Sequence, residues 1–326
     1  RQIPAHPERV VRVAYLPDGK RAVTASADDT LALWNLETGE RLRVYEGLGD
    51  DVSSLALSPD GTRLLAGSGA KSRVALVWNV ETGAQVSKPL EGHTKEISAA
   101  AISPDGTGAI TGDGKGILLV WNLIDYTQVF SFTGHTDKVN HVVYSADGTM
   151  ALSASKDKTV LLWDAKTGEI VQTFKGHTGN VRSAVFSPDG TRVLSAGEDR
   201  TMILWDSKTG RQLRSFVGHT GQVWQAVFTP DGRQALSASA DFSIRLWDIS
   251  TAQELRRYIG VHTDAVRDVV FSPDEQHFLT SSDDKSIVVW RYHTQDSMLT
   301  WVEKNRYRPP LSPEQRDLYH LDPPPS

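Results

Sequence analysis

The chain has 326 residues, no cysteine and a formal net charge of −5; 39% of its residues are hydrophobic and 23% are charged. The lack of cysteine excludes disulfides, thiol catalysis and cysteine-ligated zinc, and it suits a reducing, cytoplasmic location. No apolar run approaches the ~18 residues of a membrane span, and a mildly acidic chain offers nucleic acid no broad attraction.

Tryptophan recurs along the chain at intervals of 42 to 44 residues, at Trp34, Trp78, Trp121, Trp163, Trp205, Trp247 and Trp290. A fixed period in the low forties, with a Trp near the end of each unit, is typical of β-propeller blades. Because single blades cannot bury their own faces, seven copies predict one closed ring rather than two domains.

Three more residue types recur in register with the Trp residues. Six Trp have a His 28 residues upstream, six have Ser or Thr ten residues upstream, and five have Asp six residues upstream. With Gly-His pairs before most units, such as Gly176-His177, residues 1–292 resemble the WD-repeat family. The resemblance implies an all-β, seven-bladed β-propeller of four-stranded antiparallel blades around a central channel.

The resemblance also implies a hydrogen-bonded tetrad inside each blade. A buried indole N–H, an imidazole and a hydroxyl each need a partner, and a chain of them satisfies all three. The complete structural tetrads are His6, Thr24, Asp28 and Trp34; His135, Ser153, Asp157 and Trp163; His177, Ser195, Asp199 and Trp205; His219, Ser237, Asp241 and Trp247; and His262, Thr280, Asp284 and Trp290.

The chain start is expected to close the ring. Residues 1–4 precede His6 as Gln172 to Lys175 precede His177, where an outer strand is predicted, and no equivalent strand follows Trp290. We therefore expect the N-terminal strand to complete blade 7 and leave no open edge. Because the chain begins with Arg1 rather than Met, we also expect it to belong to a longer polypeptide.

Within the blades, short β-branched runs alternate with turn signals. In blade 5, Val181 to Phe186 and Arg192 to Ala196 flank the turn Ser187-Pro188-Asp189-Gly190. Pro presets φ and Gly accepts a positive φ, so this turn predicts two adjacent antiparallel strands. Four other blades contain the same Pro-Asp-Gly turn, beginning at Pro17, Pro59, Pro104 and Pro230.

Two blades depart from the repeat. In blade 2, Leu48, Ala66 and Ala70 stand where His, Ser or Thr, and Asp are expected. Blade 3 has Lys115 in place of Asp, within a Gly-rich loop. We favour sequence drift, with neighbouring blades holding the weaker ones; the alternative is a mobile Gly/Lys lip for a partner on the top face.

The last part of the chain, residues 294–326, does not follow the repeat. Asp296 and Ser312-Pro313 are start signals that predict two short helices packed on the propeller. This segment resembles the tail of bacterial WD-repeat proteins, which implies that the propeller is the C-terminal region of a larger multidomain protein. The sequence thus predicts a propeller over residues 1–293 and a helical tail over 294–326.

The repeated His and Asp residues invite a metal or catalytic interpretation, which we reject. They recur once per blade and would be too dispersed for one coordination sphere. The sequence has no zinc-protease motif, phosphate loop or nucleophile elbow, and His141 is a lone His beside strand residues. We predict no enzymatic activity, no metal and no cofactor.

The resemblance implies that top-face contacts come from residues three and five positions after the tetrad His, and from the residue before the turn Asp. Trp224 is the strongest candidate, because it stands outside the repeated set and an exposed Trp near Arg and Lys is typical of an interface hot spot. The other candidates for partner binding are Arg182, Asn140, Arg267, Gln222, Lys138, Lys156 and Glu198.

These residues predict a monomeric scaffold or signalling sensor that binds a protein or peptide partner, or an upstream domain of its own chain, on the top face. One alternative is nucleic-acid or acidic-partner binding through the basic sector that includes Lys71, Lys115 and Arg182. It would show as a steep loss of binding with salt. A third reading, a small-molecule-binding or hydrolytic propeller, needs converging carboxylates or His residues, and the sequence offers none.

Overall fold

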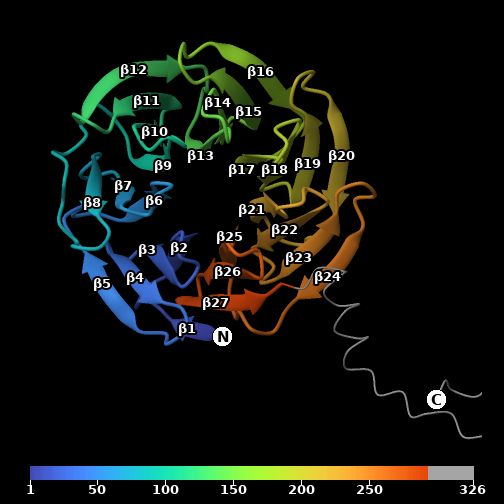
Figure 1. Ribbon diagram of the computed structural model, residues 1–326. Coiled ribbons are helices and arrows are strands. Elements are labelled where there is room, and N and C mark those ends of the chain that lie inside the picture. The colour runs from blue at the N-terminus through green and yellow to red at the C-terminus, as the bar shows by residue number, and fades with distance from the viewer. Residues whose placement is uncertain (293–326) are drawn as a thin grey trace, which may run out of the picture. The chain divides into compact units, whose positions relative to one another are not determined.

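The computed structural model describes residues 1–292, which form a ring of seven β-sheets around a central channel (Figure 1). Six sheets have four strands, one has three, and all strand pairs are antiparallel. Residues 1–292 contain no helix. The predicted seven-bladed propeller is therefore confirmed, whereas the predicted tail helices lie outside the described residues, and the boundary at residue 293 stays a prediction.

Each blade has an inner strand at the channel and further strands toward the circumference, three in six blades and two in blade 2. The inner strands are β2 (Val10–Tyr15), β6 (Val52–Leu57), β9 (Ile97–Ile102), β13 (Val139–Tyr144), β17 (Val181–Phe186), β21 (Val223–Phe228) and β25 (Val266–Phe271). The second strands are β3 (Arg21–Ser26), β7 (Arg63–Ser68), β10 (Gly108–Asp113), β14 (Met150–Ser155), β18 (Arg192–Gly197), β22 (Gln234–Ser239) and β26 (His277–Ser282).

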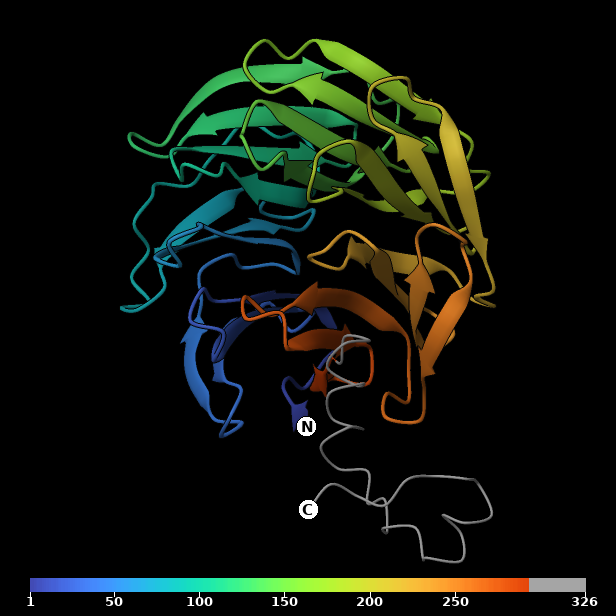
Figure 2. The same cartoon turned by 45° about the vertical axis from the view of Figure 1, so that its right-hand side comes forward.

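The third strands carry the repeated Trp residues, and the fourth strands cover the outside. The third strands are β4 (Leu31–Asn35), β8 (Ala75–Asn79), β11 (Ile117–Asn122), β15 (Thr159–Asp164), β19 (Thr201–Asp206), β23 (Ile244–Asp248) and β27 (Ser286–Arg291). The outer strands are β5 (Arg41–Tyr45), β12 (Thr127–Thr133), β16 (Ile170–Lys175), β20 (Gln212–Val217), β24 (Glu254–Tyr258) and β1 (Gln2–Pro4). Each sheet twists from the channel to the rim (Figure 2).

The turn chemistry explains why these strands pair as they do. In blade 5, the Ser187 hydroxyl donates to Asp189 Oδ1 at 2.5 Å, and the Thr191 N–H donates to the same oxygen at 3.1 Å. Gly190 takes φ 69°, a left-handed conformation that a side chain would strain. The turn between the inner and second strands is thereby fixed by its own side chains.

The N-terminal strand closes the ring. β1 pairs with β27, with Ile3 opposite Ile287, so blade 7 is built from both ends of the described chain. The backbone N–H of Ala5 then donates to Lys285 O at 3.0 Å. The prediction that residues 1–4 complete this blade is confirmed, and its third strand has no open edge.

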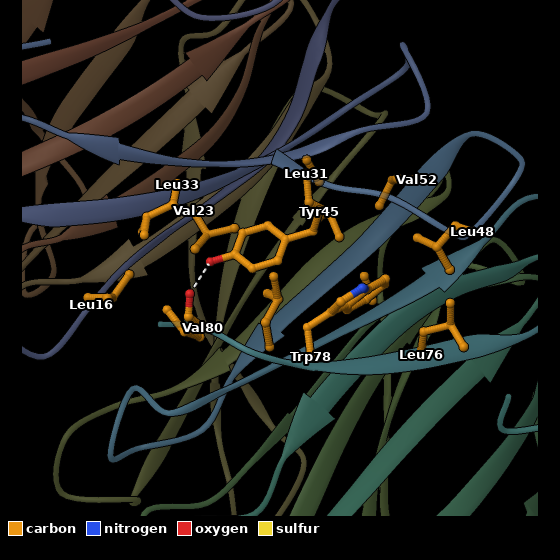
Figure 3. Packing of buried hydrophobic residues seen from close by; sticks show 13 residues of the cluster. Leu16, Val23, Leu31, Leu33, Tyr45, Leu48, Val52, Leu76, Trp78 and Val80 are labelled. Atoms are coloured by element: carbon orange, nitrogen blue, oxygen red, sulfur yellow. Dashed lines mark hydrogen bonds between the residues drawn. The ribbon is translucent and has the colours of Figure 1, made fainter. Parts of the chain in front are cut away.

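Blade 2 is the exception in the ring, because its sheet, β6-β7-β8, has no regular outer strand. Only isolated bridges, Ala75 to Leu90 and Trp78 to Gln85, join the third strand to the segment that follows it. Its core remains well packed. Tyr45 and Trp78 meet edge to face with centroids 6.4 Å apart, and the Tyr45 hydroxyl donates to Val80 O at 2.7 Å (Figure 3).

We define two faces of the ring by their loops. The top face carries the segments that lead into the inner strands, such as 176–180, and the turns between second and third strands, such as 198–200. The bottom face carries the turns between first and second strands, such as 187–191, and those between third and fourth strands, such as 207–211. These loops, rather than the strands, present the surface available to partners.

Candidate interaction site at the channel mouth

The tetrads hold each blade rigid beneath the top face. In blade 5, Trp205 Nε1 donates to Ser195 Oγ at 2.8 Å, His177 Nε2 lies 2.7 Å from that oxygen, and His177 Nδ1 lies 2.8 Å from an Asp199 oxygen. Equivalent distances of 2.7 to 2.9 Å recur in the other four complete sets. The structure thus places all twenty assigned tetrad residues in hydrogen-bonded groups.

Each tetrad is a chain of hydrogen bonds that runs from the indole to the carboxylate. The indole N–H donates to the hydroxyl, and the two His ring nitrogens lie within hydrogen-bond distance of the hydroxyl and of the carboxylate. Burial lowers the pKa of His6 and His219, although their Asp partners oppose this. Burial also acts to raise the pKa of Asp199, but hydrogen bonds and charge from His177 outweigh it, so its pKa lies below the usual range.

Blade 3 has a carboxylate beside its tetrad His that counting back from Trp misses, although His93 Nδ1 and Asp113 Oδ2 make no hydrogen bond. His93 Nε2 lies 2.7 Å from Thr111 Oγ1, and Trp121 Nε1 donates to the same oxygen at 2.7 Å. Asp113, two residues before Lys115, lies with its Oδ2 3.2 Å from His93 Nδ1, and both side chains are fully buried. Asp113 also accepts the N–H of Lys115 at 2.9 Å and so organises the Gly-rich loop.

A β-bulge in each inner strand builds the channel mouth. The register of each inner strand shifts at the fifth residue after the tetrad His position. Bulges turn a side chain out of the regular alternation, and here they direct one side chain per blade to the mouth. These seven residues line a single top-face cavity of about 250 Å³: Val11, Ser53, Ser98, Asn140, Arg182, Trp224 and Arg267.

Trp224 stands between two guanidinium groups at this mouth. The Arg182 guanidinium lies 4.2 Å from the Trp224 ring centroid, and that of Arg267 lies 3.9 Å from it. Each Arg is held by a carboxylate: Arg182 by Glu198, and Arg267 by Asp283, with Nε donating at 2.8 Å. The indole Nε1 is buried and has no hydrogen-bond partner among the described residues. The result is a rigid cation–π stack across three blades.

The remaining predicted contact residues divide into two groups. Asn140 and Lys138 line the mouth; the Asn140 amide donates to Val181 O at 2.8 Å, and Lys138 Nζ lies 3.2 Å from Glu96. Gln222 and Lys156 are not among the residues that line the cavity, and Lys156 Nζ lies 3.6 Å from Asp137. Glu198 acts through Arg182, so five of the eight candidates line one cavity: Trp224, Arg182, Asn140, Arg267 and Lys138.

A second ring of side chains, one residue further along the inner strands, lies below the mouth and was missed in the sequence. It lines a chamber of about 150 Å³ with Arg12, Ser54, Ala99, His141, Gln225 and Asp268. Arg12 donates to Asn140 O at 3.3 Å and so links blade 1 to blade 4. The signal was present, because these residues stand six positions after the tetrad His or its replacement.

Two titratable residues of this chamber, Asp268 and His141, have shifted pKa values. Asp268 is buried and accepts the Val13 N–H at 3.1 Å; burial raises its pKa, while Arg12 opposes the shift. His141 Nδ1 lies 3.1 Å from Ala184 O, and burial lowers the pKa of His141 to about 4. His141 therefore belongs to the channel wall and is neutral at pH 7.

Groups that could hold a metal ion and channel-lining carboxylates are sparse in the described part of the ring. No group of three or more His, Cys, Asp or Glu residues in positions 1–292 is placed to hold a metal ion. Within the same range, each channel cavity is lined by a single carboxylate, Asp51 in the mouth and Asp268 in the chamber. No helix of this part of the chain is long and apolar enough to span a bilayer.

Comparison with known proteins identifies the family. The model of the WD domain, G-beta repeat, matches seven segments, residues 1–35, 39–79, 84–122, 126–164, 168–206, 210–248 and 253–291. The chain therefore belongs to the WD-repeat family. Proteins of this family are generally scaffolds for protein interaction rather than enzymes.

Several eukaryotic proteins share part of the sequence. The chain is 38% identical over 68 residues to guanine nucleotide-binding protein subunit beta-1 of Caenorhabditis briggsae, covering 21% of this chain and 20% of that protein. It is 38% identical over 85 residues to the guanine nucleotide-binding protein subunit beta of Arabidopsis thaliana, 25% of this chain and 22% of that one. WD repeat-containing protein 1 of Mus musculus is 33% identical over 88 residues, 25% and 14%. The matches span at most about a fifth of these relatives.

Proposed function

We propose that this propeller is a protein-interaction module whose channel mouth binds an acidic segment of a partner protein. The observation that carries the proposal is the stack of Arg182, Trp224 and Arg267 at one wall of the mouth. Trp and Arg are the residues most often found at interface hot spots, particularly where they line a desolvated pocket.

The charge of the mouth favours an anionic group. Five cationic residues line it, Arg9, Arg12, Lys138, Arg182 and Arg267, against one carboxylate, Asp51. Neither Arg9 nor Arg12 has a carboxylate within ion-pair distance among the described residues. A carboxylate entering the cavity would therefore meet two cations that make no ion pair within residues 1–292, Arg9 and Arg12, beside three that are already paired, Lys138, Arg182 and Arg267.

Ion pairs with acidic neighbours make the broader basic sector a poor surface for nucleic acid. Lys138, Lys156 and Arg182 each have an acidic neighbour, Glu96, Asp137 and Glu198 respectively. A phosphate backbone binds best to cations arranged along a continuous track, which these pairs interrupt. The acidic protein segment is therefore the better-supported ligand.

The mouth is preorganised for this role. Bulges, ion pairs and the tetrads below fix the side chains before a partner arrives, so binding requires little rearrangement of the backbone. We expect a monomeric, cytoplasmic scaffold with a signalling role. The predicted bacterial source has no support from the relatives named above, which are eukaryotic. The predicted place at the C-terminus of a larger protein stays a prediction.

Affinity capture from a lysate of the source cells tests the proposal. Wild-type protein is compared with Trp224→Ala and with Arg267→Glu, while Lys166→Glu, an exposed charge reversal on the bottom face, serves as the control. We expect a partner that binds wild type and Lys166→Glu, elutes with increasing salt, and is lost from both mouth variants. Equal capture by all four proteins, each with the wild-type melting temperature, would exclude the mouth as the binding site.

A further inference from the structure

Four seams between blades on the bottom face are filled in the same way. At each of them, the Pro of one first turn packs against the Gly of the next blade's turn. A methyl group added at Gly61 would lie 2.6 Å from Pro17 Cδ, one at Gly148 would lie 3.4 Å from Pro104, and one at Gly232 would lie 3.3 Å from Pro188.

The seam between blades 4 and 5 lacks this filling. The first turn of blade 4 reads Ser145-Ala146-Asp147-Gly148, with Ala where most other blades have Pro. A methyl group added at Gly190, the facing turn residue of blade 5, would meet nothing within 4 Å.

A hydrogen bond across the seam, found between some other blades, is also missing here. In blades 2 and 5, an Arg at the start of the second strand reaches into the next blade's turn: Arg63 donates to Gly106 O at 2.9 Å and Arg192 to Gly232 O at 3.2 Å. Blade 4 has Met150 at this position. The unbranched, uncharged side chain makes no such bond, so the seam remains open.

The open seam forms a groove of about 770 Å³. Its floor is apolar and continuous with the core between the two blades, since Met150, Leu162 and Phe186 belong to that packing cluster. At its side stands Val171 on β16, which is 51% exposed. Exposed apolar surface joined to a concave floor is typical of a binding groove.

The rim of the groove is acidic. It carries three carboxylates, Asp147, Asp189 and Asp206, and one cation, Lys208. Hydrogen bonds from Ser187 and Thr191 lower the pKa of Asp189 to about 2, and similar bonds lower the pKa of Asp147 and Asp206. The rim is therefore negatively charged at neutral pH.

We propose that the seam between blades 4 and 5 is a second docking site, which binds a partner segment with one or two large apolar side chains flanked by Lys or Arg. The apolar residues would fill the floor at Met150 and Phe186, and the cations would pair with the rim carboxylates. The site lies on the bottom face, so a scaffold using it could hold a second protein while the mouth holds the first. Its chemistry is the opposite of that proposed for the mouth, which favours acidic segments.

Differential selection from a phage library of short random peptides tests the proposal. The closing variant Ala146→Pro/Met150→Arg restores the residues found at other seams, and the Ala146 N–H makes none of the backbone hydrogen bonds of its turn, so the fold should be retained. Peptides are selected on the wild-type protein after depletion on the closing variant. We expect enrichment of sequences in which apolar residues alternate with Lys or Arg.

The binding of a selected peptide is then measured by fluorescence anisotropy. We expect the closing variant to weaken binding about tenfold or more, Asp147→Asn/Asp206→Asn to weaken it less and in a salt-dependent way, and Trp224→Ala to leave it unchanged. The last variant separates this site from the mouth. As a matched control, Pro104→Ala, at the neighbouring seam, should not affect this peptide.

Three results would overturn the proposal: no enrichment over the closing variant, enrichment of acidic sequences, or equal affinity of wild type and closing variant. Sedimentation velocity adds a fourth. A wild-type dimer that the closing variant converts to a monomer would mean that the groove is occupied by a second copy of this chain, not by a basic partner segment.

Discussion

Blades 5 and 2 place the same tryptophan in the same position by different means. In blade 5, Trp205 donates to Ser195, which is also bonded to His177. In blade 2 those last two positions are Ala66 and Leu48, both buried, and the Trp78 indole donates instead to a backbone oxygen, Glu46 O, at 3.3 Å. One blade satisfies its buried polar groups in a network, and the other removes most of them.

The difference shows what the fold demands of a blade. The space around each Trp has to be filled and every buried donor needs an acceptor, but the residues that achieve this are not fixed. Around Trp78 of blade 2, this volume is supplied by Leu48 and by Tyr45, which lies on the outer strand β5 of blade 1. Degeneracy in the repeat therefore does not mean a loose blade.

The loops above the two blades are organised differently as well. In blade 5, Asp199 accepts the N–H groups of Thr178 and Thr201 and so ties the loop to the tetrad. Blade 2 has Ala70 at the equivalent position, after β7. There the loop is instead held by Asp50, which lies just before β6. Its Oδ2 accepts the Lys71 N–H at 2.5 Å, and its Oδ1 accepts the Asp51 N–H at 3.0 Å.

The largest expected effect comes from exchanging Ser and Ala between the two blades. Ser195→Ala leaves the Trp205 N–H and the His177 ring without their shared partner, which should cost about 2–4 kcal/mol in the free energy of unfolding. Ala66→Ser adds a hydroxyl beside Trp78, where no His can accept its proton, and should cost about 1 kcal/mol. Urea unfolding measures both; a neutral Ser195→Ala, or a larger loss for Ala66→Ser, would contradict the comparison.

A smaller effect should follow from pH. The unfolded chain takes up protons at His near pH ~6.5, whereas burial lowers the pKa of His6 and His219 in the folded protein. Between pH ~6.5 and the lower folded pKa, the unfolded state binds more protons, so stability falls as the pH falls. Blade 2 has no tetrad His and should not share this loss.

Hydrogen exchange at pH 7 and pH 5 locates the effect. We expect amides of β3 in blade 1 and β22 in blade 6 to exchange faster at pH 5, after correction for the intrinsic rate, while those of β7 in blade 2 keep their protection. Most carboxylates titrate below this window, because unfolded Asp titrates near pH ~3.9. The two shifted groups of the chamber, Asp268 on β25 and His141 on β13, lie outside the three strands compared. If β7 lost protection first, the assignment of acid sensitivity to the tetrads would be wrong.

The repeat in the sequence was sufficient to predict the blades, their turns and the closing strand. These features depend on residues such as Trp205 and Gly190, whose roles follow from spacing and local conformation alone. The role of Asp113 was not predicted, because it lies two residues before the position expected for the tetrad Asp. The Gly-rich loop places its carboxylate 3.2 Å from His93 Nδ1. Counting positions from Trp assumes that every loop has the same path.

The binding surfaces were harder to predict for a related reason. Trp224 and Arg267 were candidates individually, but their stacking depends on the bulge that turns one side chain per blade into the mouth. The groove depends on two departures, Ala146 and Met150, that only matter because both face Gly190 across a seam. In the sequence alone, each substitution looks like random variation of the repeat. Its effect on the groove becomes visible only when the position of the neighbouring blade is known.

The smallest expected effect is local to the loop of blade 2. Asp50→Asn keeps the size of the side chain but turns one of its two accepting oxygens into a donor, so either the Lys71 or the Asp51 N–H loses its acceptor. Backbone hydrogen bonds lower the pKa of Asp50 against the effect of burial, which shows that they favour the charged form. Because the loss falls on one loop, we expect about 1 kcal/mol or less in global stability.

Limited trypsin digestion reads this loop directly, because Lys71 and Arg73 are cleavage sites within it. Asp50→Asn should be cut there faster than wild type while its melting temperature barely changes. Asp199→Asn in blade 5 should differ in its melting temperature: its carboxylate is hydrogen-bonded to His177 in the buried network, so the melting temperature should drop together with the resistance to cleavage at Arg200. An equal drop in the melting temperature of the two variants would contradict this prediction. It would mean that Asp50 supports the core of blade 2 as well as its loop.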